Sequence, residues 1–154
     1  MTGRGLLFAS LALAGMVLAA VIYGIATTHS ADDGEIELSL ADVEDAGVLQ
    51  IDRAVDVYVV YNDGDPVALS ADAQHVGDAV VFCESSQLFE SPAHGEKFDI
   101  LGYYYAGPAA RGLARFHTRL EGDQIFIDLE RPIEGPQRGA GPPREPQGPF
   151  CIPT

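Results

Sequence analysis

Ala73-Gln74-His75-Val76-Gly77 and Ser91-Pro92-Ala93-His94-Gly95 are the two stretches that decide the fold of this chain. Each places a histidine and then a glycine after a small residue, with the spacings Ala-x-His and Ser-x-x-His. Imidazole is a common metal ligand, so the two boxes indicate a metal-binding frame. Their first residues, Ala73 and Ser91, carry no sulfur, so this frame has no thiolate donors.

Short β-strands are predicted on both sides of the boxes, because apolar and polar residues alternate there with period two. The expected segments are strands at 36–40, 48–51 and 55–61, a turn at 62–65 leading into 67–69, and two hairpins, 79–82 with 87–89 and 116–120 with 124–129. Only 40–45 suggests a short helical turn. The sequence therefore predicts an all-β domain, an antiparallel sandwich or partial barrel.

The residues around the boxes extend this pattern into a family resemblance. Pro66-Val67-Ala68-Leu69-Ser70 precedes the first box, Glu96-Lys97-Phe98-Asp99 continues the second, and Gly107-Pro108-Ala109 follows as a proline loop. Over residues 35 to 130 or so the chain resembles the Rieske iron-sulfur domain family, in which two cysteines and two histidines hold a [2Fe-2S] cluster. With a membrane anchor it is similar to the iron-sulfur subunit of cytochrome bc complexes, which passes electrons from quinol to a cytochrome. The resemblance implies a Rieske-like antiparallel β sandwich.

The departures from the family pattern lie at the cluster. By the resemblance, Ala73 and Ser91 replace the two cysteine ligands, Asp78 and Ala93 replace the cysteines of a loop disulfide, and Glu96 replaces a serine that tunes the cluster. Thiolate supplies the charge and covalency that hold ferric iron, whereas alanine offers no donor atom and serine only a poorly acidic hydroxyl. We therefore expect no [2Fe-2S] cluster and no resident cofactor, with a mononuclear metal ion as the alternative.

His75 and His94 remain at this degenerate site, and two interpretations stay open. In one they hold a metal ion, although structural zinc normally takes four protein ligands. In the other both are surface or loop-packing residues, with Asp78 or Glu96 beside them.

The N-terminal segment between Gly5 and Ala26 contains no charged residue. As a helix that rises ~1.5 Å per residue it is long enough to cross ~30 Å of hydrocarbon. Arg4 precedes this segment while Asp32 and Asp33 follow it, which places the N-terminus in the cytoplasm and the rest in the periplasm or outside the cell. The expected location is therefore the inner membrane, single-pass, with a cleaved signal peptide as the alternative. The predicted organisation is a cytoplasmic end at 1–4, a transmembrane helix at 5–26, a linker at 27–34, a Rieske-like β domain at 35–132 and a Pro/Gly-rich tail at 133–154.

The formal net charge is −14, from 23 acidic and 9 basic residues among 154. Such a surface repels nucleic acid and anionic ligands, so neither is an expected partner. A positively charged carrier protein would instead be attracted.

Cys83 and Cys151 are the only cysteines. On the oxidising side of a membrane a disulfide between them is the default expectation, with two free thiols or a metal-bound thiolate as alternatives. The tail that contains Cys151 is rich in proline and cannot build a core. It is either a disordered end or an extended strap, lying on a partner or on its own domain and anchored by Phe150 and Cys151.

Tyr103, Tyr104 and Tyr105 form the densest aromatic cluster in the sequence. Aromatic residues are favoured in interface cores, so these tyrosines and Phe150 are candidate partner contacts. The alternative is that they pack a loop against the sheet.

An intact scaffold with an emptied site predicts a non-catalytic, membrane-anchored Rieske-like accessory subunit of a respiratory or photosynthetic electron-transfer complex. Its partners would be integral membrane subunits, among them a cytochrome. The alternative function is a redox or metal-binding electron-transfer protein that holds a metal through His75 and His94. No nucleophile triad, phosphate loop or pair of catalytic carboxylates is found, so the chain is not predicted to be an enzyme itself.

Overall fold

The computed structural model describes residues 34–51, 56–73 and 76–153. The elements in this part of the chain are β1 (Glu35–Ser39), α2 (Leu40–Ala46), β2 (Val48–Ile51), β3 (Val57–Asn62), β4 (Asp65–Ser70), β5 (Val81–Cys83), β6 (Leu88–Glu90), β7 (Lys97–Asp99), β8 (Tyr104–Ala106), β9 (Arg115–Glu121) and β10 (Gln124–Ile133). Across these residues no helix has the length and apolar character needed to cross a membrane. The transmembrane helix predicted at 5–26 lies outside the described residues, and so does His75.

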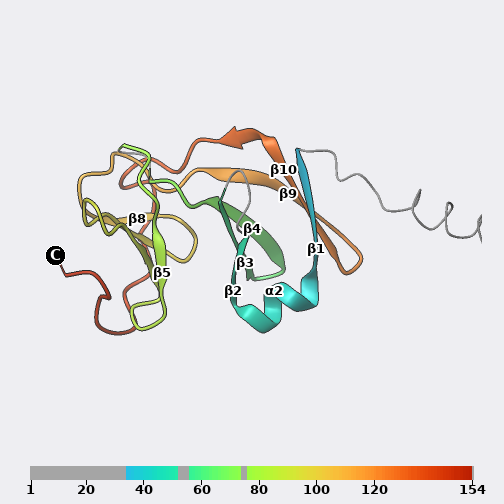
Figure 1. Cartoon of the computed structure of the whole chain (residues 1–154), viewed down its shortest axis with the longest axis horizontal. Coiled ribbons are helices and arrows are strands. Elements are labelled where there is room, and N and C mark those ends of the chain that lie inside the picture. The colour runs from blue at the N-terminus through green and yellow to red at the C-terminus, as the bar shows by residue number, and fades with distance from the viewer. Residues whose placement is uncertain (1–33, 52–55, 74–75, 154) are drawn as a thin grey trace, which may run out of the picture. The chain divides into compact units, whose positions relative to one another are not determined.

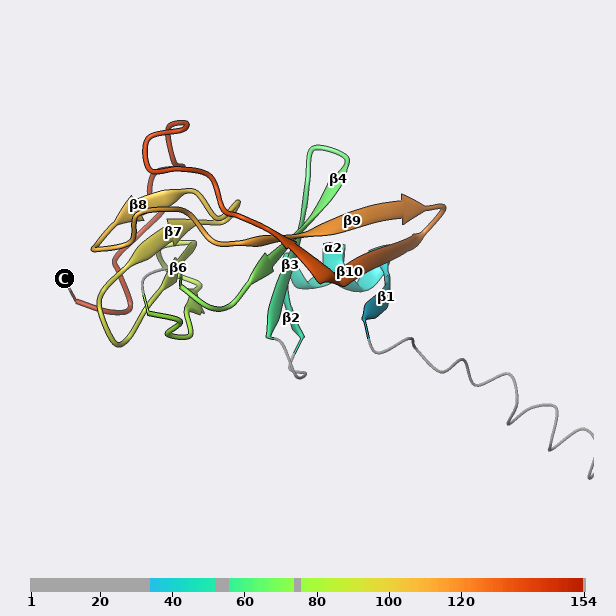
Figure 2. The same ribbon diagram turned by 90° about the horizontal axis from the view of Figure 1, so that it is seen from above.

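The strands form two antiparallel sheets (Figures 1 and 2). One sheet has six strands in the order β1-β10-β9-β4-β3-β2, and the other has four in the order β5-β6-β7-β8. Both box segments lie in the connections of the smaller sheet, before β5 and between β6 and β7. The arrangement confirms the predicted all-β class, the short helical turn and the hairpins.

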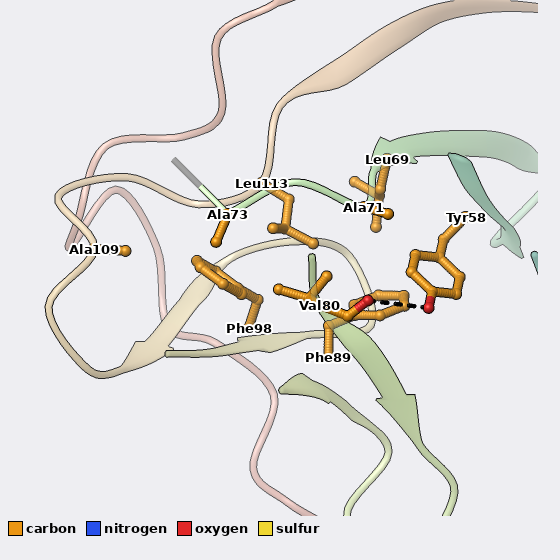
Figure 3. Close-up of a cluster of buried hydrophobic side chains, with 9 residues drawn as sticks. All are labelled: Tyr58, Leu69, Ala71, Ala73, Val80, Phe89, Phe98, Ala109 and Leu113. Atoms are coloured by element: carbon orange, nitrogen blue, oxygen red, sulfur yellow. Dashed lines mark hydrogen bonds between the residues drawn. The ribbon is translucent and has the colours of Figure 1, made fainter. Parts of the chain in front are cut away.

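The strands β3 and β4 contribute side chains to two hydrophobic cores, one on each face, because successive side chains of a strand point to opposite sides. Val57, Val59 and Ala68 lie in the core of the larger sheet. Their neighbours Tyr58 and Leu69 lie in a second core that extends to the smaller sheet (Figure 3). Because both faces of β3 are buried, its sequence is a nearly continuous apolar run.

The hairpin between β3 and β4 turns on Asp63 and Gly64, whose φ angles are 51° and 97°. Two consecutive residues with positive φ are the signature of the tight turn that matches the twist of paired strands. The Asp-Gly pair in the sequence therefore sets the register of β3 against β4, which pairs Asn62 with Asp65 and Val57 with Ser70.

Residues 134–153, which we call the C-terminal strap, leave β10 and run along the smaller sheet to end beyond β5 and β8 (Figure 1). Backbone hydrogen bonds fix the strap along its course: Gly112 N to Pro136 O (2.8 Å), Arg138 N to Ala110 O (3.2 Å) and Gln147 N to Ser86 O (2.9 Å). Cys83 and Cys151 form a disulfide across a separation of 68 residues. The predicted disulfide is thus confirmed, and the strap interpretation holds with the domain itself as the surface it covers.

Candidate functional site

The two box segments fold into loops with the same backbone hydrogen bonds. In the first, Ala73 N donates to Asp78 O (2.8 Å) and Gly77 N donates to Ala73 O (3.0 Å). In the second, Ser91 N donates to Glu96 O (2.8 Å) and Gly95 N donates to Ser91 O (3.0 Å). Gly77 and Gly95 have φ angles of 76° and 73°, a region that favours glycine. The two loops are therefore closed by the same pair of backbone hydrogen bonds, and neither begins with a cysteine.

Strand register shows which way the second loop directs its side chains. Phe89 pairs with Phe98 and Glu90 with Lys97 in the β6–β7 ladder. The Ser91 N to Glu96 O bond continues that ladder by one pair. Because side chains alternate along strands, Ser91 and Glu96 share the face of the two phenylalanines, while Glu90 and Lys97 occupy the opposite face.

The positions that would carry thiolates are buried and poor in donor atoms. Ala73 is 2% exposed and belongs to the same hydrophobic cluster as Phe98 and Ala109. In Figure 3 Ala73 and Ala109 lie at the end of this cluster that is remote from Tyr58. Ser91 is fully buried, and among the described residues its hydroxyl accepts a single, long hydrogen bond of 3.4 Å from His94 N. Apolar side chains thus extend to the place where the first loop begins.

Glu96 is the most unusual residue of the site. Its side chain is fully buried, and neither carboxylate oxygen has a hydrogen-bond partner in the part of the chain that the structure describes. A Cβ atom added to Gly107, whose φ is 99°, would lie 2.6 Å from Glu96 Cα, so the proline loop rests directly on the Glu96 backbone. Burying a carboxyl group without a hydrogen-bond partner lowers the stability of the fold. Glu96 therefore destabilises the sheet face that it shares with Ser91.

His94 links the two loops. Its Nδ1 contacts the carboxylate of Asp78, at one of the positions where the resemblance places a loop cysteine. The contact is half-exposed at the surface, with His94 45% and Asp78 32% accessible. The contact agrees with the loop-packing interpretation of His94, and metal binding by His94 stays a prediction. Among the described residues no group of three or more His, Cys, Asp or Glu side chains is placed to hold a metal ion.

A surface groove of about 500 Å³ lies beside His94. The loop tips, the end of β8 and the end of the strap line it: Pro92, Ala93, His94, Gly95, Ala106, Gly107, Ile152 and Pro153. Val76, at the tip of the first loop, is 59% exposed. This end of the smaller sheet is therefore a mainly apolar surface.

The aromatic residues proposed as partner contacts all have contacts within the domain. The Arg115 guanidinium lies 5.3 Å from the Tyr103 ring centre, and the Arg138 guanidinium lies 4.2 Å from that of Tyr104. Tyr105 and Phe150 meet edge to face with ring centres 6.2 Å apart. All four remain partly exposed, so contact with a partner stays a prediction.

The face opposite Glu96 carries a buried ion pair that sequence reasoning missed. Lys97 Nζ and the Glu90 carboxylate are 3.6 Å apart and both side chains are fully buried. Ser86 Oγ (2.7 Å) and Ile152 N (2.7 Å) also donate to the Glu90 carboxylate. A signal was present, since Lys97 is the only lysine of the chain and directly precedes a core phenylalanine.

The residues present do not fit a [2Fe-2S] cluster. Ala73 lies in an apolar cluster and has no donor atom, and Ser91 offers a single hydroxyl. The buried carboxyl group of Glu96 shares that face and supplies no thiolate. A cluster needs thiolates to balance ferric iron and sulfide, and these positions supply none.

No known family profile matches the chain. The cytochrome b6-f complex iron-sulfur subunit of Chlorobaculum thiosulfatiphilum is 34% identical to it over 71 residues, which are 46% of this chain and 39% of that protein. The subunit of the same name from Prochlorococcus marinus (strain NATL1A) is 27% identical over 93 residues, 58% of this chain and 52% of that protein. The chain therefore spans 39% to 52% of the length of these relatives.

Among solved structures, the plasma membrane Rieske protein PetC3 of Synechocystis PCC 6803 has a similar fold. It is 28% identical to this chain, with a TM-score of 0.53 over 60% of this chain and 98% of that protein. The similarity thus covers nearly the whole of that solved domain.

Proposed function

We propose, from the premise that this chain belongs to the Rieske-like proteins in a degenerate form without the ligand cysteines, that it is a non-catalytic accessory subunit of a membrane electron-transfer complex. It binds no [2Fe-2S] cluster, and docking rather than electron transfer is its role. Its partners are integral membrane subunits, among them a cytochrome. Residues 5–26 anchor it as a single-pass protein in the inner membrane, with the β domain on the periplasmic or outer side.

The main support for this proposal is the pair of loops. Both loops keep their closed backbone, yet Ala73 and Ser91 begin them and Glu96 places a buried carboxyl group on the same face. A domain that keeps the scaffold of an electron carrier without the donors for its metal retains a surface for association. The groove and Val76 at the loop tips supply apolar surface for such a contact.

The proposal is tested first by purification from native membranes in a mild detergent. We expect the chain to migrate with a cytochrome-containing assembly in native electrophoresis, and the same assembly to be recovered through a tag on a partner subunit. Migration as a lone monomer without any cytochrome contradicts the docking role.

The absence of a cluster is tested separately by reconstitution with ferrous iron and sulfide. We expect the wild-type chain to give no paramagnetic signal of a reduced diiron centre. The matched variant Ala73→Cys/Ser91→Cys, with Glu96→Ser added, restores the family's ligand set and is expected to take up iron. A cluster signal in the wild-type chain refutes the proposal.

The second candidate is a redox or metal-binding protein that holds one ion through His75 and His94. The Asp78 carboxylate at His94 Nδ1 favours it, because metal-binding imidazoles usually have their other nitrogen held by a carboxylate or carbonyl group. Metal analysis of the purified chain separates the two functions. Stoichiometric iron, copper or zinc that disappears in His94→Ala supports the metal protein, and its absence supports the accessory subunit.

A further inference from the structure

The two sulfurs of the Cys83–Cys151 disulfide differ in their access to solvent. Cys83 is 1% exposed, whereas Cys151 lies exposed near the end of the strap. The Ser85 hydroxyl donates to Pro149 O (2.8 Å) and lies 3.2 Å from Cys83 Sγ and 3.5 Å from Cys151 Sγ. Cys151 is therefore the more exposed of the two cysteines to an external thiolate, and a hydroxyl group stands beside the Cys83 sulfur, which would leave.

Besides the disulfide, the strap end is held by the buried ion pair. The Glu90 carboxylate accepts hydrogen bonds from Cys151 N (3.3 Å) and Ile152 N (2.7 Å). Lys97 Nζ donates to Ile152 O (2.9 Å) and lies 4.7 Å from the Phe150 ring centre. The strap keeps water from both charges, and a buried ion pair loses hydration that its own attraction only partly restores. Opening the strap breaks these three hydrogen bonds, but it also rehydrates Glu90 and Lys97, which offsets part of that loss once the covalent link is cut.

We propose that Cys83, Cys151 and Ser85 form a thiol–disulfide exchange site whose reductant is a protein dithiol and whose product is the chain with an open strap. The thiolate of the reductant bonds to Cys151 Sγ as the Cys83–Cys151 bond breaks. Cys83 leaves as a thiolate that takes the electron pair, and as Pro149 moves away with the strap the Ser85 hydroxyl turns from Pro149 O to donate to this thiolate. The second thiol of the reductant then attacks the mixed disulfide and releases Cys151. The reductant is now a disulfide, and its two thiol protons end on Cys83 and Cys151.

Opening the strap changes two surfaces. It uncovers the Glu90–Lys97 face of the smaller sheet, and it removes Ile152 and Pro153 from the wall of the groove beside His94. The redox state of one disulfide thus controls the surface next to both loops. This exchange stands whether or not the chain docks on a membrane complex.

Hydrogen exchange on the full chain in mild detergent tests the opening. After reduction with dithiothreitol and alkylation, we expect the amides of Gln147, Cys151 and Ile152 to exchange at least about tenfold faster, while those of β9 and β10 keep their rates. The variant Cys151→Ser, without any reductant, is expected to show the same pattern. Unchanged protection of these three amides in the reduced chain overturns the proposal, and so does loss of protection in β9 and β10, which signals general unfolding.

The direction of attack is tested with glutathione, a monothiol that stops at the mixed disulfide. Mass spectrometry is expected to place the glutathione adduct on Cys151, and an adduct mainly on Cys83 contradicts the mechanism. Ser85→Ala is expected to slow reduction by dithiothreitol about fivefold, the effect of one hydrogen bond to the leaving thiolate, while Ser85→Thr keeps the wild-type rate. Equal rates for all three chains exclude the assistance assigned to Ser85.

Discussion

Two glutamates of the smaller sheet are equally buried but are expected to affect stability in opposite directions. Glu90 and Glu96 are both 0% exposed. The Glu90 carboxylate accepts three hydrogen bonds, from Ser86 Oγ and from Cys151 N and Ile152 N, and pairs with Lys97. The Glu96 carboxylate has no hydrogen-bond partner among the described residues.

Glu96→Met replaces the unpartnered carboxyl group by an apolar side chain of similar size. A buried polar group without a partner costs ~1–3 kcal/mol, and this cost is relieved in the variant. For a domain of this size the gain raises the midpoint of thermal unfolding by about 3–10 °C. Glu90→Met is the matched control, and it is expected to lower stability by ~3–5 kcal/mol because Lys97 stays buried without its counter-charge.

Thermal unfolding of the full-length variants in detergent, followed by circular dichroism, measures both effects. The prediction is opposite signs, with the Glu96 variant melting above the wild type and the Glu90 variant below it. Destabilisation by Glu96→Met would refute the reasoning, because it would mean that the carboxylate has a partner in solution, such as a bound cation.

Three further outcomes are expected. Hydrogen bonding and charge from Arg119 hold the pKa of Glu35 below its ordinary value. The stability that Glu35 contributes is therefore present above the ordinary pKa and is lost as pH falls through the lowered pKa of the folded state. In Arg119→Met, titration by NMR should show a higher Glu35 pKa. Burial raises the pKa of Tyr58, so the wild type loses stability as pH rises through that raised pKa. Tyr58→Phe should not show this alkaline loss. In denaturant titrations at neutral pH it should be ~1 kcal/mol less stable, because the hydrogen bond to Val80 O is absent. Gly107→Ala should lower the unfolding midpoint, because the new methyl group meets the Glu96 backbone at a positive φ.

Alternation in the sequence was enough to predict the larger sheet and its hairpins. The Asp63-Gly64 turn and the run from Val57 to Tyr61 are local signals, and each fixes its own pairing. The two loops were predicted from the family resemblance, and in the structure Gly77 and Gly95, each four residues after the start of its loop, have positive φ. Local patterns therefore identified the fold class, and the resemblance identified the degenerate site.

The smaller sheet was only partly predictable, because its strands are too short to show a period. β7 and β8 have three residues each and went unpredicted. The contacts that Ile152 of the strap makes with Glu90 and Lys97 join residues distant in sequence, so no local pattern predicts them. The unpartnered state of Glu96 is likewise invisible in sequence, since only register shows that it faces the phenylalanines and not Lys97.

Four strands of three residues need cross-links beyond their own ladder hydrogen bonds, because so short a sheet buries little on its own. In the resembling family a cluster and a loop disulfide supply such cross-links at the loop tips. Here the contact between Asp78 and His94 joins the described parts of the two loops, and such half-exposed contacts stabilise weakly. The stronger cross-links, the disulfide and the Glu90–Lys97 pair that binds Ile152, lie on the opposite face of the sheet. In the described part of the chain the smaller sheet is thus cross-linked mainly on the face opposite the loop tips.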